Sequence, residues 1–133
     1  MPDRKEMSHD NVEFIRRLWE AVDEGGIEAA LGLTDSEAEW APHPAGGQVL
    51  STEQLLRFFD QYRDQRELLK ATPYSIRAHG NKVLASGSFR LHGPSGRISE
   101  FQIHWVSEFE NGRFVRARSF ATEADALRSI GPE

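Results

Sequence analysis

The stretch Arg97–Pro132, RISEFQIHWVSEFENGRFVRARSFATEADALRSIGP, decides the fold of this chain. Its first half places mostly apolar residues at odd positions and mostly polar residues at even ones, which is the pattern of a half-buried antiparallel strand. Asn111-Gly112 predicts a turn, and a second strand follows it. Thr122 then predicts a helix N-cap, and Gly131-Pro132 predicts the end of that helix. The stretch therefore predicts a β-hairpin followed by a short last helix.

The composition of the 133-residue chain restricts the kind of protein that it encodes. The length suits one domain with one core, which we assign to residues 9–133 after a disordered N-terminus at residues 1–8. A formal charge of -5, with scattered basic residues, argues against nucleic acid as a partner. The chain contains no cysteine, no apolar run long enough to cross a bilayer and no signal-peptide pattern. With no metal-ligand spacing either, we expect a cytoplasmic protein without a cofactor, metal or membrane segment.

Helical patterns dominate the first half of the chain, and strand patterns dominate the second. Asp10 is the predicted N-cap of a first helix, which Gly25-Gly26 ends. A short helix over residues 27–33 and a strand over residues 38–41 follow. Ser51 and Gln54 then form a capping box for an amphipathic helix that runs to about residue 70. From residue 74 we predict four antiparallel strands and the last helix, which together indicate an α+β fold with helices on one face of a curved sheet.

Four segments carry a family pattern. They are Val22–Ala29, Glu39–Pro42, Asn111–Arg118 and Ala126–Gly131. With the order of the elements, they resemble the SnoaL-like branch of the nuclear transport factor two-like superfamily over roughly residues 9–131. The resemblance implies a cone-shaped α+β fold, in which a curved antiparallel sheet carries helices on its concave face and encloses a pocket. Relatives include ketosteroid isomerases, polyketide cyclases, epoxide hydrolases and members with no known reaction, so the fold alone assigns no activity.

The catalytic residues of ketosteroid isomerases have no counterparts here. In those relatives a helix tyrosine and strand carboxylates supply the base and the oxyanion hole. Their positions correspond to Leu18, Ala41 and Trp105, none of which can transfer a proton. The aspartate of cyclase-like and epoxide-hydrolase-like relatives corresponds to Ser119. The resemblance therefore implies a protein without the known acid–base set.

The register of the last hairpin decides which side chains face the pocket, because a slip of one residue turns every side chain to the other face. A two-residue turn at Asn111-Gly112 would pair Phe109 with Phe114 and turn two arginines inward, where they could clamp an anion. A three-residue loop that includes Glu110 would pair Trp105 with Ala117 and turn the arginines outward.

We prefer the second register. The first pairs Arg118 with Trp105 and turns both Arg116 and Arg118 into the pocket, where burying each unpaired guanidinium group would cost several kcal/mol. The pocket lining is then aromatic with a few hydroxyl groups, which suits an apolar or aromatic small molecule held by shape. The predicted ligand-binding residues are Trp40, Phe58, Tyr62, Phe89, Ile103, Trp105, Ser107, Val115, Ala117 and Ser119.

Two residues are candidates for catalysis. His43 lies between prolines near the expected pocket mouth, where it could be a general base or a solvated loop residue. Tyr62 could donate its phenol to a ligand carbonyl or fill the core. An enzymatic alternative is thus an isomerase, polyketide cyclase-like enzyme or hydrolase that uses these residues with Ser107 or Ser119. A third interpretation is a structural dimerisation module with a filled cone.

The outer face of the last hairpin predicts an interface between two copies of the chain. In the preferred register, Val106 and Phe114 form an apolar patch with polar flanks on this face. We therefore expect a homodimer. The contact residues would be His104, Val106, Phe114, Arg116 and Arg118.

Overall fold

The structure of the protein is a computed structural model that describes residues 4–43, 48–63, 67–93 and 96–131, without the side chains of residues 4–8 and 59–69. Its elements are α1 (Arg4–Leu31), β1 (Glu39–Ala41), β2 (Leu50–Ser51), α2 (Thr52–Arg63), β3 (Glu67–His79), β4 (Lys82–His92), β5 (Ile98–Glu110), β6 (Arg113–Phe120) and α3 (Glu123–Ile130). The strand order is β2-β1-β6-β5-β4-β3. The sheet is mixed, because β1 runs parallel to β6 while the other neighbours are antiparallel. The predicted α+β class and curved sheet are confirmed.

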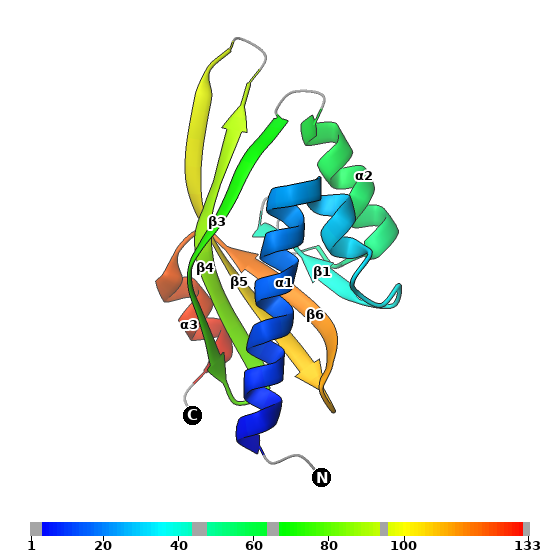
Figure 1. Cartoon of the computed structure of the whole chain (residues 1–133), viewed down its shortest axis with the longest axis vertical. Helices are drawn as coiled ribbons and strands as arrows, with labels where there is room; N and C mark the ends of the chain where they lie inside the picture. Colours follow the sequence, from blue (N-terminus) through cyan, green and yellow to red (C-terminus); the bar gives the residue numbers. More distant parts are fainter. Residues whose placement is uncertain (1–3, 44–47, 64–66, 94–95, 132–133) are drawn as a thin grey trace.

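The helices cover both faces of this sheet. Figure 1 shows α1 lying across the concave face, α2 beside it, and α3 on the opposite side. The sequence pattern predicted helices on the concave face only, whereas α3 packs on the convex face. There Ala126 forms a buried cluster with Leu84 and Val106. The N-cap prediction for α3 is confirmed, since the Thr122 side chain accepts a hydrogen bond from the backbone N–H of Asp125 at 3.2 Å.

Helix α1 begins earlier than the sequence pattern indicated. It starts at Arg4 rather than after Asp10, so residues 4–8, which were expected to be disordered, are helical. Gly26 interrupts it with φ 82° and ψ -176°, a conformation that residues with a Cβ rarely adopt. The predicted break at Gly25-Gly26 is therefore confirmed as a kink between two helical segments.

Helix α2 is shorter than predicted. Its capping box is present, with Ser51 N–H donating to Gln54 Oε1 at 2.9 Å and Gln54 N–H donating to Ser51 Oγ at 3.2 Å. The helix ends at Arg63 rather than near residue 70, because the chain from Glu67 onward pairs with β4. The opposite edge of β3 is held by Asp23 of α1, whose carboxylate accepts a hydrogen bond from the backbone N–H of Ala71 at 3.0 Å. Contacts between distant segments thus override the helical pattern of residues 67–70.

The last hairpin combines features of both predicted registers. The turn has two residues, Asn111 with φ 52° and Gly112 with φ 78°, and it pairs Phe109 with Phe114. A bulge in β6 at Val115 then shifts the register, so that Trp105 faces Ser119. The predicted three-residue loop and the pair of Trp105 with Ala117 are therefore wrong.

The predicted outward direction of the arginines is confirmed. Opposite Glu108 in the sheet, Arg116 donates to the Glu108 carboxylate at 3.2 Å, and its other nitrogen lies 3.9 Å from Glu39. Arg118 is exposed. Phe114, however, faces the concave core, where it is 5% exposed. The bulge lets Phe114 and Ala117 occupy the same face although they are an odd number of residues apart.

Candidate functional site

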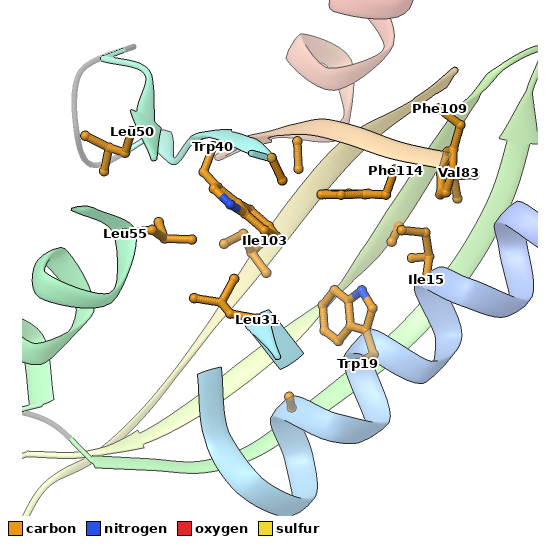
Figure 2. Close-up of a cluster of buried hydrophobic side chains, with 14 of the residues drawn as sticks. Ile15, Trp19, Leu31, Trp40, Leu50, Leu55, Val83, Ile103, Phe109 and Phe114 are labelled. Atoms are coloured by element: carbon orange, nitrogen blue, oxygen red, sulfur yellow. The ribbon is translucent and has the colours of Figure 1, made fainter. Parts of the chain in front are cut away.

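A cavity of about 70 Å³ lies between α1 and the concave face of the sheet. Most of its wall comes from α1, and the rest comes from β1, α2 and the three strands β4, β5 and β6. Every described residue of the wall is apolar. Figure 2 shows several of these side chains pointing toward a common space, Trp19 and Leu31 from α1 and Trp40 and Leu55 from the opposite side. The lining residues are Ile15, Leu18, Trp19, Val22, Ile27, Ala30, Leu31, Trp40, Leu55, Phe89, Trp105 and Ala117.

The contribution of α1 comes from one stripe of the helix. Ile15, Leu18, Trp19 and Val22 are spaced three and four residues apart, so they share one face. None of these four residues is among the ligand-binding residues predicted from the sequence. The space in front of this stripe arises from the curvature of the sheet, which the helical spacing of the residues does not reveal.

Trp19 reaches the sheet because Gly87 of β4 has no side chain. A Cβ at Gly87 would lie 2.7 Å from the Trp19 ring and 2.4 Å from the carbonyl oxygen of Thr72 on β3. Both distances are shorter than a carbon atom tolerates. The Trp19 ring also packs against Phe89, with 5.5 Å between the ring centroids. Gly87 thus sets the depth of the cavity floor.

The three tryptophans of the chain all line the cavity. Trp40 is held at its polar end, because its Nε1–H donates to Thr52 Oγ1 at 3.1 Å. Its ring meets Trp105 edge to face, with centroids 6.3 Å apart and planes at 85°. Such a geometry is favourable for aromatic pairs. The wall is therefore built from rings whose positions are fixed by specific contacts.

The predicted ligand-binding residues divide into wall residues and others. Trp40, Phe89, Trp105 and Ala117 line the cavity. Ile103 is buried in the core cluster, and Phe58 packs against that cluster. Ser107 is buried opposite Ala117, and Val115 occupies the bulge. Tyr62 belongs to α2, but its side chain lies outside the described residues.

The positions that correspond to ketosteroid isomerase catalytic residues also fall near the cavity. Leu18 and Trp105 line it, while Ala41 is buried at the end of β1. All three of these side chains are apolar.

The structure brings His43 and Ser119 together. The Ser119 hydroxyl oxygen accepts the backbone N–H of His43 at 2.8 Å and lies 2.9 Å from Nδ1 of the His43 ring. Ser119 is 3% exposed, and burial lowers the pKa of His43 below the ordinary value for histidine. Since Ser119 faces Trp105 across the hairpin, this polar pair lies beside the cavity wall.

The predicted dimer contacts are placed differently from what the sequence pattern indicated. His104 is buried with Nδ1 2.7 Å from Ser86 Oγ, and Val106 is buried under α3. Phe114 lies in the concave core. These three side chains are covered by the chain itself, so only Arg116 and Arg118 remain accessible. The apolar patch expected on this face does not form.

Among the helices of the described part of the chain, none is long and apolar enough to span a membrane. Within the same residues, no group of three or more histidine, aspartate or glutamate side chains is arranged to hold a metal ion.

The fold is α+β, with a long helix across a curved, unclosed sheet and an apolar cavity between the two. This arrangement is typical of the class of cone-shaped nuclear transport factor two-like proteins. The family model of the SnoaL-like domain matches residues 15–117, and the chain belongs to this family. A search of curated proteins finds no match. The resemblance inferred from the sequence is thus confirmed.

Solved structures of the same fold are similar to this chain at low sequence identity. A nuclear transport factor two-like protein of unknown function from Burkholderia pseudomallei matches with a TM-score of 0.71 and 21% identity, over 92% of this chain and 98% of that one. TerC, co-crystallised with polyporic acid, matches with a TM-score of 0.72 and 15% identity, over 92% of this chain and 99% of TerC. A protein with a ketosteroid isomerase-like fold from Catenulispora acidiphila was solved in complex with trimethylamine. It matches with a TM-score of 0.68 and 13% identity, over 91% of this chain and 94% of that one. At these identities the similarity shows the fold alone.

Proposed function

We propose that this SnoaL-like protein binds a small apolar or aromatic molecule in the cavity between α1 and the sheet. The observation that carries the proposal is the cavity wall, in which every described residue is apolar and three are tryptophans. A ligand that fills the space gains van der Waals contacts with this apolar wall.

The size of the cavity indicates how much of a ligand it holds. An engineered apolar cavity of about 150 Å³ binds benzene, and sites for larger ligands span about 300–1,000 Å³. The present cavity of about 70 Å³ is smaller than either. We therefore propose that the ligand inserts one ring or short aliphatic group and that wall side chains move apart to admit it.

Two leucine variants test this proposal. Leu55 and Leu84 are both 1% exposed, but Leu55 lines the cavity and Leu84 lies under α3 on the convex face. Leu55→Ala should enlarge the cavity and strengthen the binding of α-methylstyrene at least fourfold, which is the effect of about one further buried methylene group. Leu84→Ala removes the same atoms elsewhere and should leave the affinity unchanged.

The titration is followed by intrinsic fluorescence, because all three tryptophans line the cavity. Equal affinity in the wild type and both variants would place the probe outside the cavity. No binding to any of the three proteins at millimolar probe would contradict the proposal and favour the structural module with a filled cone.

An isomerase, polyketide cyclase-like or hydrolase activity is the second candidate, favoured by the contact between His43 and Ser119. A neutral histidine beside a hydroxyl group can accept a proton from it. If such a reaction is found, His43→Ala should abolish turnover and keep ligand affinity. Unchanged turnover in this variant would remove His43 from the reaction.

We also propose a cytoplasmic homodimer, whose contact on the outer face of the hairpin does not use the apolar patch that the sequence pattern predicted. Because Arg116 and Arg118 are the predicted contact residues that remain accessible, the contact should be polar and should weaken as salt is added. Sedimentation at micromolar concentration tests it. A monomer at low salt would exclude the dimer.

A further inference from the structure

The part of α1 that follows the Gly26 kink, residues 27–31, forms one wall of the cavity. We propose that this segment is a lid, which turns about Gly26 and admits the ligand when it opens. The inference rests on the proposed function and adds how access to the site is controlled. A movement of the wall is needed, because the cavity of about 70 Å³ is smaller than the one of about 150 Å³ that holds benzene.

The lid has an apolar inner face and an exposed outer face. Ile27, Ala30 and Leu31 line the cavity, and their spacing of three and four residues places them on one side of the segment. Ala30 and Leu31 are each 6% exposed, whereas Ala29 on the other side is exposed. Figure 2 shows Leu31 pointing toward the same space as Trp19. The closed lid therefore separates the cavity from solvent.

The backbone of Gly26 gives the lid a hinge. Its φ of 82° and ψ of -176° interrupt the helix, and a Cβ there would meet none of the described atoms within 4 Å. Glycine is thus required by the dihedral angles and not by crowding. A Cβ at Gly25 would lie 2.8 Å from the Cβ of Ala29, whereas Cβ atoms four residues apart in a continuous helix are about 5–6 Å apart. The kink therefore folds the lid back against the residue before the hinge.

The part of α1 before the hinge is fixed to the sheet. Asp23 accepts the backbone N–H of Ala71 on β3 at 3.0 Å, only three residues before Gly26. Farther back, Trp19 packs closely over Gly87 of β4. A change in the Gly26 dihedral angles would therefore move the lid and leave the long part of the helix in place.

The hydrogen bonds at the end of the lid are local. The N–H of Gly32 donates to the Glu28 carbonyl at 3.1 Å, and Thr34 Oγ1 donates to the Leu31 carbonyl at 2.9 Å. Donor and acceptor are at most four residues apart, so these bonds can move together with the lid. Contact with the rest of the cavity wall comes from the three apolar side chains of its inner face.

The other walls of the cavity are more firmly held. Leu55 belongs to α2, whose first residue, Thr52, accepts a hydrogen bond from Trp40 Nε1. Four lining residues belong to strands that are paired in the sheet, namely Trp40, Phe89, Trp105 and Ala117. Moving these walls breaks hydrogen bonds between distant segments, whereas opening the lid mainly exposes apolar surface. The lid is therefore the wall that opens most readily.

A disulfide across the hinge tests the lid. Gly25→Cys with Ala29→Cys supplies the only two cysteines of the chain, and their Cβ atoms need to separate by only about 1 Å to reach disulfide geometry. Oxidation, checked by loss of free thiols, holds the lid closed, and reduction of the same protein is the matched control. Stopped-flow tryptophan fluorescence gives the association and dissociation rates of α-methylstyrene. Oxidation should lower both rates about tenfold or more and leave Kd nearly unchanged, because only open molecules exchange ligand.

A methyl group at the same place should have the opposite effect. Gly25→Ala places a Cβ 2.8 Å from that of Ala29, an overlap that disfavours the closed position. Both rates should therefore rise about fivefold or more, again with little change in Kd, because the lid is closed in the free and in the bound protein. The control is Gly32→Ala at the other end of the lid, where the nearest described atom is 3.5 Å away and both rates should stay the same.

The outcomes separate this inference from the proposed function. If α-methylstyrene binds and the oxidised and reduced proteins have equal rates, the lid is wrong and the cavity stands. A change in affinity without parallel changes in both rates would also overturn the lid and make residues 27–31 a fixed wall. If the wild type does not bind the probe, both fail. Should one variant not fold, the other decides, since the two predict opposite changes.

Discussion

Two regions of the concave core are built from the same kinds of residue but packed differently. Around Phe109 and Phe114 the space is filled, with Phe14 within 5.9 Å of both rings between centroids. Around Trp19 and Trp105 the rings enclose a cavity of about 70 Å³. The difference arises because the hairpin turn brings two phenylalanine rings into edge-to-face contact at one end, whereas Gly87 and the kinked α1 set the spacing at the other. The filled end supplies stability, and the open region supplies a site.

The largest expected effect lies in the filled end. Phe114→Ala removes a ring that contacts Phe14, Trp40 and Phe109, so it should lower the free energy of unfolding by about 3–5 kcal/mol in urea denaturation. Where the variant remains folded, its affinity for α-methylstyrene should change less than in Leu55→Ala. A loss below about 1 kcal/mol would show that the two regions are packed alike.

The next effect lies at the floor of the cavity. Gly87→Ala places a methyl group 2.7 Å from the Trp19 ring and 2.4 Å from the Thr72 oxygen, so it should cost about 1–3 kcal/mol and displace Trp19. Its tryptophan emission should shift as well. The control is Gly32→Ala, where the nearest atom to the new methyl group is 3.5 Å away and the stability should hardly change. Similar losses in both variants would contradict the assigned role of Gly87.

A smaller effect is expected at the polar end of Trp40. Thr52→Val removes the acceptor of the Nε1–H and should lower stability by about 1 kcal/mol. It should also alter tryptophan emission, because Trp40 can then rotate. Thr34→Val removes a hydrogen bond of 2.9 Å to the Leu31 carbonyl, in which Trp40 takes no part, and should cost a similar amount without the change in emission. An unchanged spectrum in Thr52→Val would mean that the aromatic contacts alone hold Trp40.

The smallest effect concerns the protonation of His43. Because burial lowers its pKa in the folded protein, the folded state binds this proton less readily than the unfolded state does. The contribution of the neutral His43 ring to stability is present above the pKa of the unfolded state, near 6.5. It is lost as the pH falls through the lower pKa of the folded state. NMR titration should give a midpoint below 6.5. The difference in Tm between wild type and His43→Gln should shrink from pH 7.5 to pH 5. A midpoint at or above 6.5 would contradict the burial of this ring.

Local features of the fold were predictable because neighbouring residues form them. The capping box of Ser51 and Gln54, the N-cap Thr122 and the break at Gly26 all depend on contacts or dihedral angles within a few residues. The outward direction of Arg116 was also predictable, since burying an unpaired guanidinium group is too costly in any register. Four of the predicted ligand-binding residues do line the cavity, since the alternation of strand residues placed them on the concave face.

The sequence alone was thus enough to predict the SnoaL-like family, the positions of the turns and the helix caps. The end of α2, the bulge at Val115, the convex position of α3 and the contact of His43 with Ser119 became apparent only in the folded chain. These features depend on groups far apart in the chain, as with His43 and Ser119, which are 76 residues apart. Their free energies arise when strands pair and helices pack, and no local pattern encodes which distant partner will be present.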